Sequence, residues 1–344
     1  MSSSIFSLID WHVPVPIFTP TWTISTSARL TFIYVGSLYV STATRIGQAK
    51  SKDGVLLNKD DAVVVKSRLR VASVVSLVAL GSTSEMIRRT AYPTQSIFFG
   101  TLASLRLIGI PLPIPSFLHN NSLPFQPSLV EYSSQHIIPA ITLPLLLTST
   151  LFAGPLLAAG LDGTLLGQRH TPSLKAALKE KLGNVWGIRN YLIGPLTEEI
   201  VFRGCIVSLH ALADLPKSIL IFATPLYFGV AHLHHAYEGY VKGGRTRSAL
   251  KRACLISTIQ FAYTSMFGWY ANFLFLRTNT LLAPLVSHIF CNIMGLPDPI
   301  EAVRIHPHRK WSIYGAYVAG IVGFALSIMP FTKPSLFGGS WYWQ

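Results

Sequence analysis

The stretch "PLTEEIVFRG", residues 195–204, places two adjacent glutamates and an arginine among apolar neighbours. Leu192–Leu196 and Ile200–Phe202 surround the charges and are apolar enough to lie in a membrane. Ionised side chains inside a bilayer are energetically expensive, so they usually face the interior of a helical bundle and serve a function. The stretch therefore predicts a membrane protein with a polar site among its helices.

The composition extends this prediction to the whole chain. Of its 344 residues, 50% are hydrophobic and 12% are charged, whereas about a quarter of the residues of a typical soluble protein are charged. Apolar stretches recur almost to the end of the chain. They predict an all-α, polytopic transmembrane bundle of about 7–8 spans that forms a single domain, residues 1–344. The stretches are Ala28–Thr42, Val71–Ile87, Ile97–Ile110, His136–Asp162, Trp186–Leu212, Ile219–His234, Leu255–Phe275, Leu281–Met294 and Ile313–Met329.

The net charge of +14 does not indicate nucleic-acid binding. Most basic residues lie in the gaps between apolar stretches, as the cytosolic loops of membrane proteins lead one to expect. If the short Ile97–Ile110 segment does not cross the membrane, all the major basic stretches face one side. These stretches are Arg45–Arg70, Pro172–Leu182, Lys242–Arg252 and Arg304–Lys310.

The three cysteines predict neither a metal site nor a disulfide framework, and the N-terminus does not predict a signal peptide. Cys205, Cys254 and Cys291 lie in or beside apolar stretches, and their spacing matches neither a zinc knuckle nor a disulfide framework. We interpret each cysteine as a packing residue. No basic region followed by an apolar core opens the chain, so a cleaved signal peptide is not expected.

The charges of the opening stretch divide into a pair and a single group. On a helix, Glu199 and Arg203 are four residues apart and face each other. Glu198 is rotated from Glu199 by about 100° and points elsewhere. An internal ion pair that orients helices accounts for Glu199 and Arg203, but it leaves Glu198 unexplained. We therefore interpret Glu198 as a functional carboxylate.

Histidines form two further polar clusters in the C-terminal half. In "YFGVAHLHHAYEG", His232 is the deepest in the apolar run and is the better candidate for a function. His234 and His235 fit an interfacial histidine patch as well as they fit a functional role. In "PLVSHIFCNIMG", His288 and Asn292 are four residues apart on one helix face. A single buried histidine is usually a satisfied core residue, but this pair accompanies two other polar clusters.

Together these groups suit hydrolysis of an amide within or near a membrane. A carboxylate and an imidazole can deprotonate a water molecule held between them. A second histidine and an asparagine amide can donate hydrogen bonds to a developing oxyanion. Two histidines and one glutamate could instead bind zinc, although the H-E-x-x-H motif of soluble metalloproteases is absent.

The motifs resemble those of a known family. Glu198-Glu199-x-x-Phe202-Arg203, Phe228-x-x-x-His232 and His288-x-x-x-Asn292 look like the motifs of the type 2 CaaX prenyl proteases. These are Ras-converting endopeptidases of the endoplasmic reticulum membrane, within the wider family of CaaX proteases and bacteriocin-processing enzymes. The resemblance is strongest from about Tyr191 to Pro297. It reaches back more faintly to "TFIYVGSLYV", "RLRVASVVS" and "LPLLLTSTLFAGPLL", so it covers most of the chain, and it has no departure at the four positions that matter most.

The resemblance implies an activity and a role for each residue. Family members remove the C-terminal aaX tripeptide from proteins whose CaaX cysteine carries a farnesyl or geranylgeranyl group. Glu198 and His232 would activate water, and His288 with Asn292 would stabilise the oxyanion. Glu199, Arg203 and Phe202 would support the site, within a catalytic core at residues 184–297, and no metal or other cofactor is expected.

The resemblance also implies the surroundings of the enzyme. Its partners would be the lipid bilayer and prenylated CaaX proteins, such as Ras-like and Rho-like small GTPases and pheromone-type peptides. It would lie in the endoplasmic reticulum membrane, with an intramembrane catalytic cavity open to the cytosol and the bilayer. Three alternatives remain open: a zinc-dependent peptidase that uses the same residues, a non-catalytic scaffold that binds lipidated partners, and a transporter.

Overall fold

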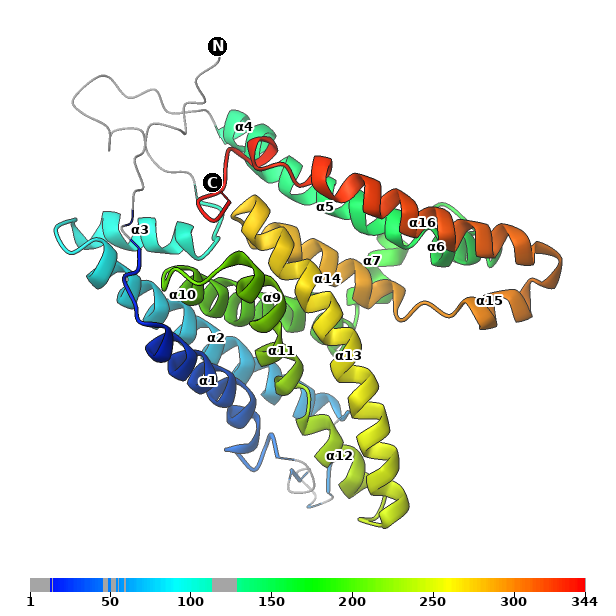
Figure 1. The fold of residues 1–344 in the computed structure, drawn as a ribbon. Helices are drawn as coiled ribbons and strands as arrows, with labels where there is room; N and C mark the ends of the chain where they lie inside the picture. Colours follow the sequence, from blue (N-terminus) through cyan, green and yellow to red (C-terminus); the bar gives the residue numbers. More distant parts are fainter. Residues whose placement is uncertain are drawn as a thin grey trace.

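The fold is all-helical, as the sequence predicts. The computed structural model describes residues 15–45, 60–112 and 129–343, together with a few single positions and short pieces from 13 to 58. Within these residues every named element is a helix, and β-structure is limited to two isolated bridges. Figure 1 shows the helices gathered around a central group that includes α9 and α10.

The α-helices vary widely in length. In the first half they are α1 (Pro20–Gly36), α2 (Ala62–Ala91), α3 (Ile97–Leu107), α4 (Leu129–Tyr132), α5 (Ile138–Leu151), α6 (Ala153–Leu161) and α7 (Leu174–Leu182). In the second half they are α8 (Val185–Ile188), α9 (Gly194–Glu199), α10 (Ser208–Ala211), α11 (Pro225–Ala231), α12 (His234–Lys242), α13 (Arg247–Thr278), α14 (Leu282–Met294), α15 (Pro299–Ile305) and α16 (Lys310–Phe331).

Short π-helical and 3₁₀ segments connect several of these helices. The π-helical segments are η4 (Ser133–Ile137), η5 (Arg189–Ile193), η6 (Ile200–Val207) and η7 (Ile219–Ala223). The 3₁₀ segments are η2 (Ser37–Tyr39), η8 (Pro307–Arg309) and η9 (Pro334–Phe337). The predicted Trp186–Leu212 segment is therefore a chain of short helices with different hydrogen-bond patterns.

The expected 7–8 membrane spans are not confirmed. Among the described residues, two helical stretches are long and apolar enough to cross a bilayer, Ile219–Lys242 and Pro307–Phe331. A bent pair, Val130–Leu151 with Ala153–Leu161, makes a third if it is counted as one span. The α3 and α14 helices are apolar but short, because a helix needs about 20 residues to cross the hydrocarbon core.

The bend between α5 and α6 has a local cause. The two helices are bent by 77° at a break between Leu151 and Ala153. Pro155 follows directly, and it has no N–H to donate to the carbonyl of Leu151 four residues earlier. The sequence therefore predicts a kink in this stretch, and the structure has one.

The basic stretch before α2 differs from the prediction. The sequence predicts that Arg45–Arg70 is a gap between apolar stretches, but α2 begins at Ala62. Lys66, Arg68 and Arg70 therefore lie on the first turns of a helix, where some basic side chains turn towards the protein. The basic Lys242–Arg252 stretch likewise continues into α13, which begins at Arg247.

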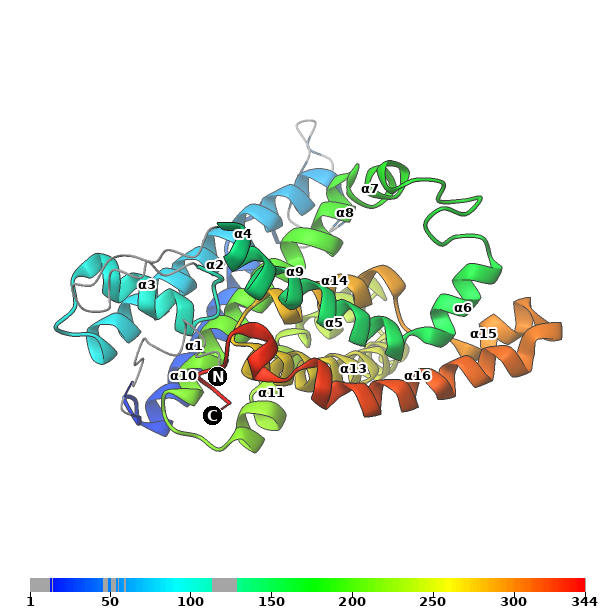
Figure 2. The same cartoon turned by 90° about the horizontal axis from the view of Figure 1, so that it is seen from above.

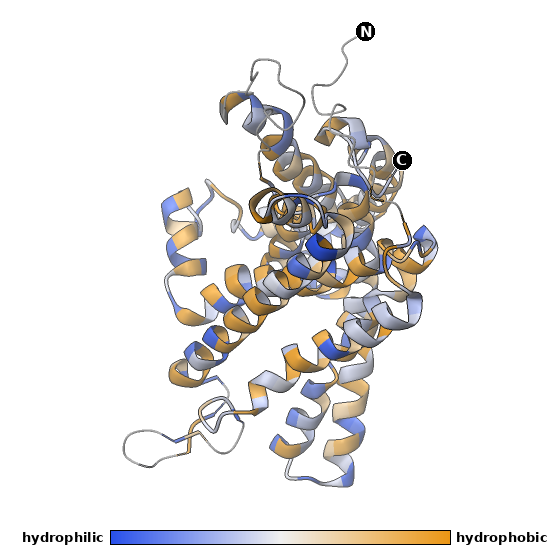
Figure 3. Ribbon diagram, turned by 90° about the vertical axis from the view of Figure 1, so that its left-hand side faces the viewer, coloured by the Kyte–Doolittle hydropathy of each residue, from blue (hydrophilic) through white to orange (hydrophobic). Residues whose placement is uncertain are grey.

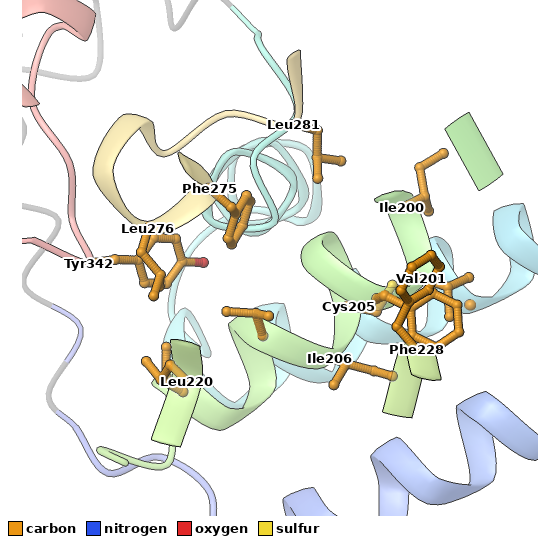
Figure 4. Close-up of a cluster of buried hydrophobic side chains, with 14 of the residues drawn as sticks. Ile200, Val201, Cys205, Ile206, Leu220, Phe228, Phe275, Leu276, Leu281 and Tyr342 are labelled. Atoms are coloured by element: carbon orange, nitrogen blue, oxygen red, sulfur yellow. The ribbon is translucent and has the colours of Figure 1, made fainter. Parts of the chain in front are cut away.

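The core forms around η6, whose eight residues are all buried. It packs against α1, α2, α11 and α13, and Figure 4 shows the apolar side chains that fill the space between them. They include Val201, Ile206, Phe228 and Phe275, each at most 2% exposed. The charged stretch of the sequence thus continues into an element that is buried along its whole length.

The outer helices expose apolar residues. Figure 2 shows α16 running beside α5 and α6 along one side of the molecule. On α16, Val318, Ile321 and Leu326 are 61%, 58% and 74% exposed. Figure 3 shows apolar residues distributed along most helices rather than confined to the interior. Such surfaces suit a protein surrounded by lipid.

Candidate active site

The predicted site residues come from neighbouring short helices. Glu198 and Glu199 are the last residues of α9, and Arg203 follows in η6. His232 directly follows the end of α11, whereas His288 and Asn292 are one turn apart on α14. The α9 and α14 helices pack against each other, and α11 packs against η6, so the three sequence motifs meet in space (Figure 1).

Glu199 is the buried centre of the cluster. Its side chain is 0% exposed, and its Oε1 lies 3.1 Å from Nη1 of Arg203, the contact expected from their spacing. The same Oε1 accepts a hydrogen bond from Nδ1 of His288 at 2.7 Å. Glu199 therefore ties the first motif to the third. Its other oxygen is buried without a partner, as are Nε and Nη2 of Arg203.

Aromatic rings enclose the Arg203 guanidinium. Its central carbon lies 4.6 Å from the ring centroid of Phe228 and 5.5 Å from that of Phe267. Phe202 packs edge-on against Phe228, with ring centroids 5.1 Å apart. A desolvated cation over an aromatic face is stabilised by about 2 kcal/mol. The pair of Glu199 and Arg203 is thus a rigid support and has little contact with solvent.

Glu198 has different surroundings from its neighbour. Its side chain is 23% exposed, and its Oε2 lies 3.6 Å from Nε2 of His288. His288 therefore stands between the two glutamates, with one ring nitrogen towards each. The Nδ1 hydrogen bond to Glu199 orients the ring and leaves Nε2 on the side of Glu198.

His232 and Asn292 are held by backbone carbonyls. Nδ1 of His232 lies 2.8 Å from the carbonyl oxygen of Phe228, and its ring packs against the Phe228 ring. Asn292 donates from Nδ2 to the carbonyl oxygen of Asn190 at 2.8 Å. The amide has a second N–H, and His232 has a second ring nitrogen, so each keeps hydrogen-bonding capacity.

Two cavities meet at these side chains. A cavity of about 830 Å³ is lined by all four predicted catalytic residues, Glu198, His232, His288 and Asn292. Its other walls are largely apolar and aromatic, and they include Leu151, Phe152, Met266, Phe267 and Phe324. A second cavity of about 420 Å³ also touches Glu198, His232 and Asn292, but its walls include Arg68, Arg189, His234, His235 and Glu238. The carboxylate and the imidazole therefore lie between an apolar space and a polar one.

Comparison with known proteins places the chain in a family. The family model for the Type II CAAX prenyl endopeptidase Rce1-like family matches residues 181–294. The CAAX prenyl protease 2 of Arabidopsis thaliana is 34% identical over 253 residues, which cover 70% of this chain and 77% of the relative. The chain belongs to the type II CAAX prenyl protease family. It is therefore an enzyme of the peptidase class.

Other relatives of the protease align over shorter ranges. The CAAX prenyl protease 2 of Homo sapiens is 38% identical over 217 residues, or 61% of this chain and 63% of the relative. The probable CAAX prenyl protease 2 of Schizosaccharomyces pombe is 45% identical over 120 residues, or 35% of this chain and 43% of the relative. No solved structure matches the chain.

A metal ion has one candidate place in the part of this prenyl protease that the structure describes. Nitrogen and oxygen atoms of His234, His235 and Glu238 lie within 4.8 Å of one another. Glu238 is already paired with Arg68 at 3.3 Å, which disfavours a further cation there. Glu198, His232 and His288 do not form such a group, although both histidines have Nδ1 bonded elsewhere and Nε2 left for another partner.

Some residues of the protease site carry no signal in the sequence. Phe267 contacts both Arg203 and His288, but it is one aromatic residue among many on α13. Arg68 and Tyr39 contact Glu238 from the N-terminal part of the chain. Because they are at least 170 positions from Glu238, the sequence pattern does not predict these contacts. The contacts of Glu199 with Arg203 and of Phe228 with His232 join residues four apart, so helical spacing alone can predict them.

Proposed function

We propose that this protease removes the C-terminal aaX tripeptide from prenylated CaaX proteins. The observation that carries the proposal is the position of Glu198 and His232 between an apolar and a polar cavity. A prenyl chain favours an apolar environment, whereas the peptide bond beside it and the terminal carboxylate are polar. A substrate with both parts would place its scissile bond where the two spaces meet.

In the proposed mechanism, water is activated between Glu198 and His232. The two side chains line the same two cavities, and the proposed water would bind to both of them there. The water oxygen attacks the scissile carbonyl carbon as its proton passes to the Glu198 carboxylate. When the tetrahedral intermediate collapses, that proton passes to the leaving amine nitrogen, and the tripeptide departs with a free amino group.

His288 and Asn292 would stabilise the oxyanion. Both line the apolar cavity that holds Glu198, and both have ring or amide nitrogens available for a further hydrogen bond. His288 donates from Nε2 when its ring carries a proton there, and Glu199 holds the ring in that orientation through Nδ1. Pre-positioned donors of this kind each contribute about 10²–10³-fold to the rate of acyl-transfer enzymes.

Glu199, Arg203 and Phe202 would position the other groups without touching the substrate. Glu199 and Arg203 are buried in the described structure, and Phe202 is 4% exposed. Glu199 bonds to His288 of the third motif, and Phe202 packs against Phe228 of the second motif. This network therefore links the three helices whose relative placement the mechanism requires.

The test is release of a tripeptide from a farnesylated CaaX peptide by the purified protein in detergent. The unprenylated twin of the peptide is the matched substrate. We expect cleavage of the farnesylated peptide after its cysteine and little cleavage of the twin. Equal cleavage of both peptides, or cleavage of neither, would contradict the proposed function.

A zinc-dependent peptidase is the second candidate, because His232 and His288 both hold Nδ1 and leave Nε2 for another partner. Metal-bound histidines commonly have this arrangement. The amide of Asn292, however, is a poor zinc ligand. We expect activity to survive exhaustive chelation. Activity that is lost on chelation and restored by added zinc would favour the second candidate.

The finer features of the substrate and location follow the family resemblance. We propose Ras-like and Rho-like small GTPases and prenylated pheromone-type peptides as the class of substrates. The proposed location is the endoplasmic reticulum membrane, with the polar cavity open towards the cytosol. Fractionation of cells that express the tagged protein, together with analysis of the C-termini of their prenylated proteins, tests both features.

A further inference from the structure

The polar cavity contains an arginine that the proposed mechanism does not use. Arg68, on the second turn of α2, lines this cavity together with Glu198 and His232. Its side chain is only 15% exposed. A cation that is largely removed from water needs hydrogen-bond partners or a ligand to offset the loss of hydration.

The donors of Arg68 are only partly used. Nε donates to the carbonyl oxygen of Thr44 at 2.9 Å, and Nη1 donates to Oε1 of Glu238 at 3.3 Å. Nη2 is buried without a partner. Because most buried polar atoms in folded proteins are hydrogen-bonded, an unused donor on a residue that lines a cavity is available to an acceptor that enters the cavity, either water or a group of a ligand.

The neighbours of Arg68 hold its guanidinium in place. Glu238 is 1% exposed, and its Oε1 also accepts from the hydroxyl of Tyr39 at 3.0 Å. The Tyr39 ring lies 5.8 Å from the guanidinium carbon. His235 approaches the other oxygen of Glu238 at 3.2 Å. Arg68 is thus fixed from two sides and presents its remaining donors in one orientation.

The other arginine of the cavity is arranged differently. Arg189 is 37% exposed, pairs with Asp60 at 3.6 Å, and donates from Nε to the side chain of Asn190 at 2.9 Å. Its charge has a carboxylate partner and solvent, so it has less need of a ligand.

We propose that Arg68 binds the C-terminal carboxylate of the substrate and thereby helps to fix the length of the released peptide at three residues. This inference rests on the function proposed above. A tripeptide extends about 10 Å, so a chain whose scissile bond lies at Glu198 and His232 ends within reach of the same cavity. An arginine fork matches a carboxylate in charge and shape.

The experiment compares two farnesylated CaaX peptides that differ only at the C-terminus, one a free acid and the other an amide. Both are given to the purified full-length protein in detergent. We expect the wild-type kcat/KM to favour the acid by about 10- to 100-fold, since a hydrogen bond between charged groups has this effect. In Arg68→Gln the ratio of kcat/KM for the acid to kcat/KM for the amide should fall to about one, mainly through a higher KM for the acid.

Matched variants separate recognition from folding. Arg70→Gln removes the same charge from an exposed position on α2 that lines neither cavity, and it should keep the preference for the acid. The double variant Arg68→Gln/Glu238→Gln leaves no buried carboxylate without its partner, and it should lose the preference. Because the preference is a ratio within one variant, partial unfolding lowers both rates and leaves the ratio unchanged.

Three results would overturn the role of Arg68. These are equal cleavage of acid and amide by the wild-type protein, retention of the preference in both Arg68 variants, and its loss in Arg189→Gln instead. Equal cleavage by the wild-type protein overturns the role of Arg68 even if a variant does not fold. Cleavage of neither peptide by the wild-type protein would instead contradict the proposed function itself.

Discussion

Glu198 and Glu199 are neighbours in the chain but have different surroundings. Glu199 is completely buried and bonded to both Arg203 and His288, whereas Glu198 is 23% exposed and borders both cavities. The helical rotation of about 100° between successive residues separates the two roles. The same substitution, glutamate to glutamine, can therefore be made at both positions to distinguish a catalytic role from a structural one.

The first prediction concerns Glu198→Gln. The substitution removes a carboxylate that can accept a proton but keeps its size, and the only ion pair in which the described structure shows Glu198 is the 3.6 Å contact with His288. We expect the rate of peptide cleavage to fall by about 10²–10⁴-fold, the usual contribution of a positioned general base. Thermal stability should stay near that of the wild type. Single-turnover rates and thermal unfolding measure the two effects, and an active Glu198→Gln protein would remove Glu198 from the mechanism.

The second prediction concerns Glu199→Gln. This change leaves the guanidinium of Arg203, which is 1% exposed, without its carboxylate. Removing one partner of a buried pair typically destabilises a protein by about 3–5 kcal/mol. We expect the melting temperature and the activity to fall together, with Glu198→Gln as the matched control. A Glu199→Gln protein that is as stable as the wild type but inactive would instead assign the chemistry to Glu199.

The site was only partly predictable from single residues. The contact between Glu199 and Arg203 follows from helical spacing, because residues four apart lie on one face. The hydrogen bond from His288 to Glu199 spans 89 positions and depends on how α14 packs against α9. Hydropathy and spacing say nothing about such packing, so the bridging position of His288 between the two glutamates was not foreseen.

At the scale of elements, the sequence locates apolar segments but not their internal breaks. Trp186–Leu212 was predicted as one segment, yet it contains α8, η5, α9, η6 and α10. Hydropathy does not distinguish a π-helical turn from an α-helical one, because both bury the same side chains. Such turns are frequent at functional sites, and here η6 begins at the residue after Glu199.

The third prediction concerns the packing of α16 against α5. A Cβ atom added at Gly320 would lie 2.7 Å from the carbonyl oxygen of Thr150 and 3.1 Å from that of Leu151. Since both atoms belong to the backbone, the helices would have to separate. We expect Gly320→Ala to destabilise the protein by about 1–3 kcal/mol, as overpacking usually does.

The matched control for this prediction lies on the same helix. Nothing lies within 4 Å of a Cβ atom added at Gly315, so Gly315→Ala should be neutral or slightly stabilising. Thermal unfolding in detergent compares the two variants. Equal stability of Gly320→Ala and Gly315→Ala would show that the close approach of α16 to α5 contributes nothing.

At the scale of the whole molecule, the basic stretch before α2 contacts the basic stretch that follows α12. Asp60 lies 3.6 Å from both Lys242 and Arg189, and its carbonyl oxygen accepts a hydrogen bond from Trp186. The α7 helix packs against α8, and one cavity is lined by both α7 and α15. Two of the four basic stretches therefore contact each other directly, and the side of the membrane on which the four lie stays a prediction.

The fourth prediction is that this side faces the cytosol. Positively charged loops are retained there during insertion, so positions in all four basic stretches should react with a membrane-impermeant thiol reagent in intact microsomes. Single cysteines at Lys66, Lys175, Ser248 and Arg304, all exposed, report on the four stretches in a protein whose native cysteines are replaced. A cysteine at Arg89, at the other end of α2, is the control and should react only after detergent opens the microsomes. The 30-residue α2 helix is about 45 Å long, but it is not among the stretches apolar enough to cross by composition, so the Arg89 cysteine tests whether α2 crosses. Reaction at Lys66 with protection at Ser248 would contradict the shared side, because the Asp60–Lys242 contact requires both stretches to lie together.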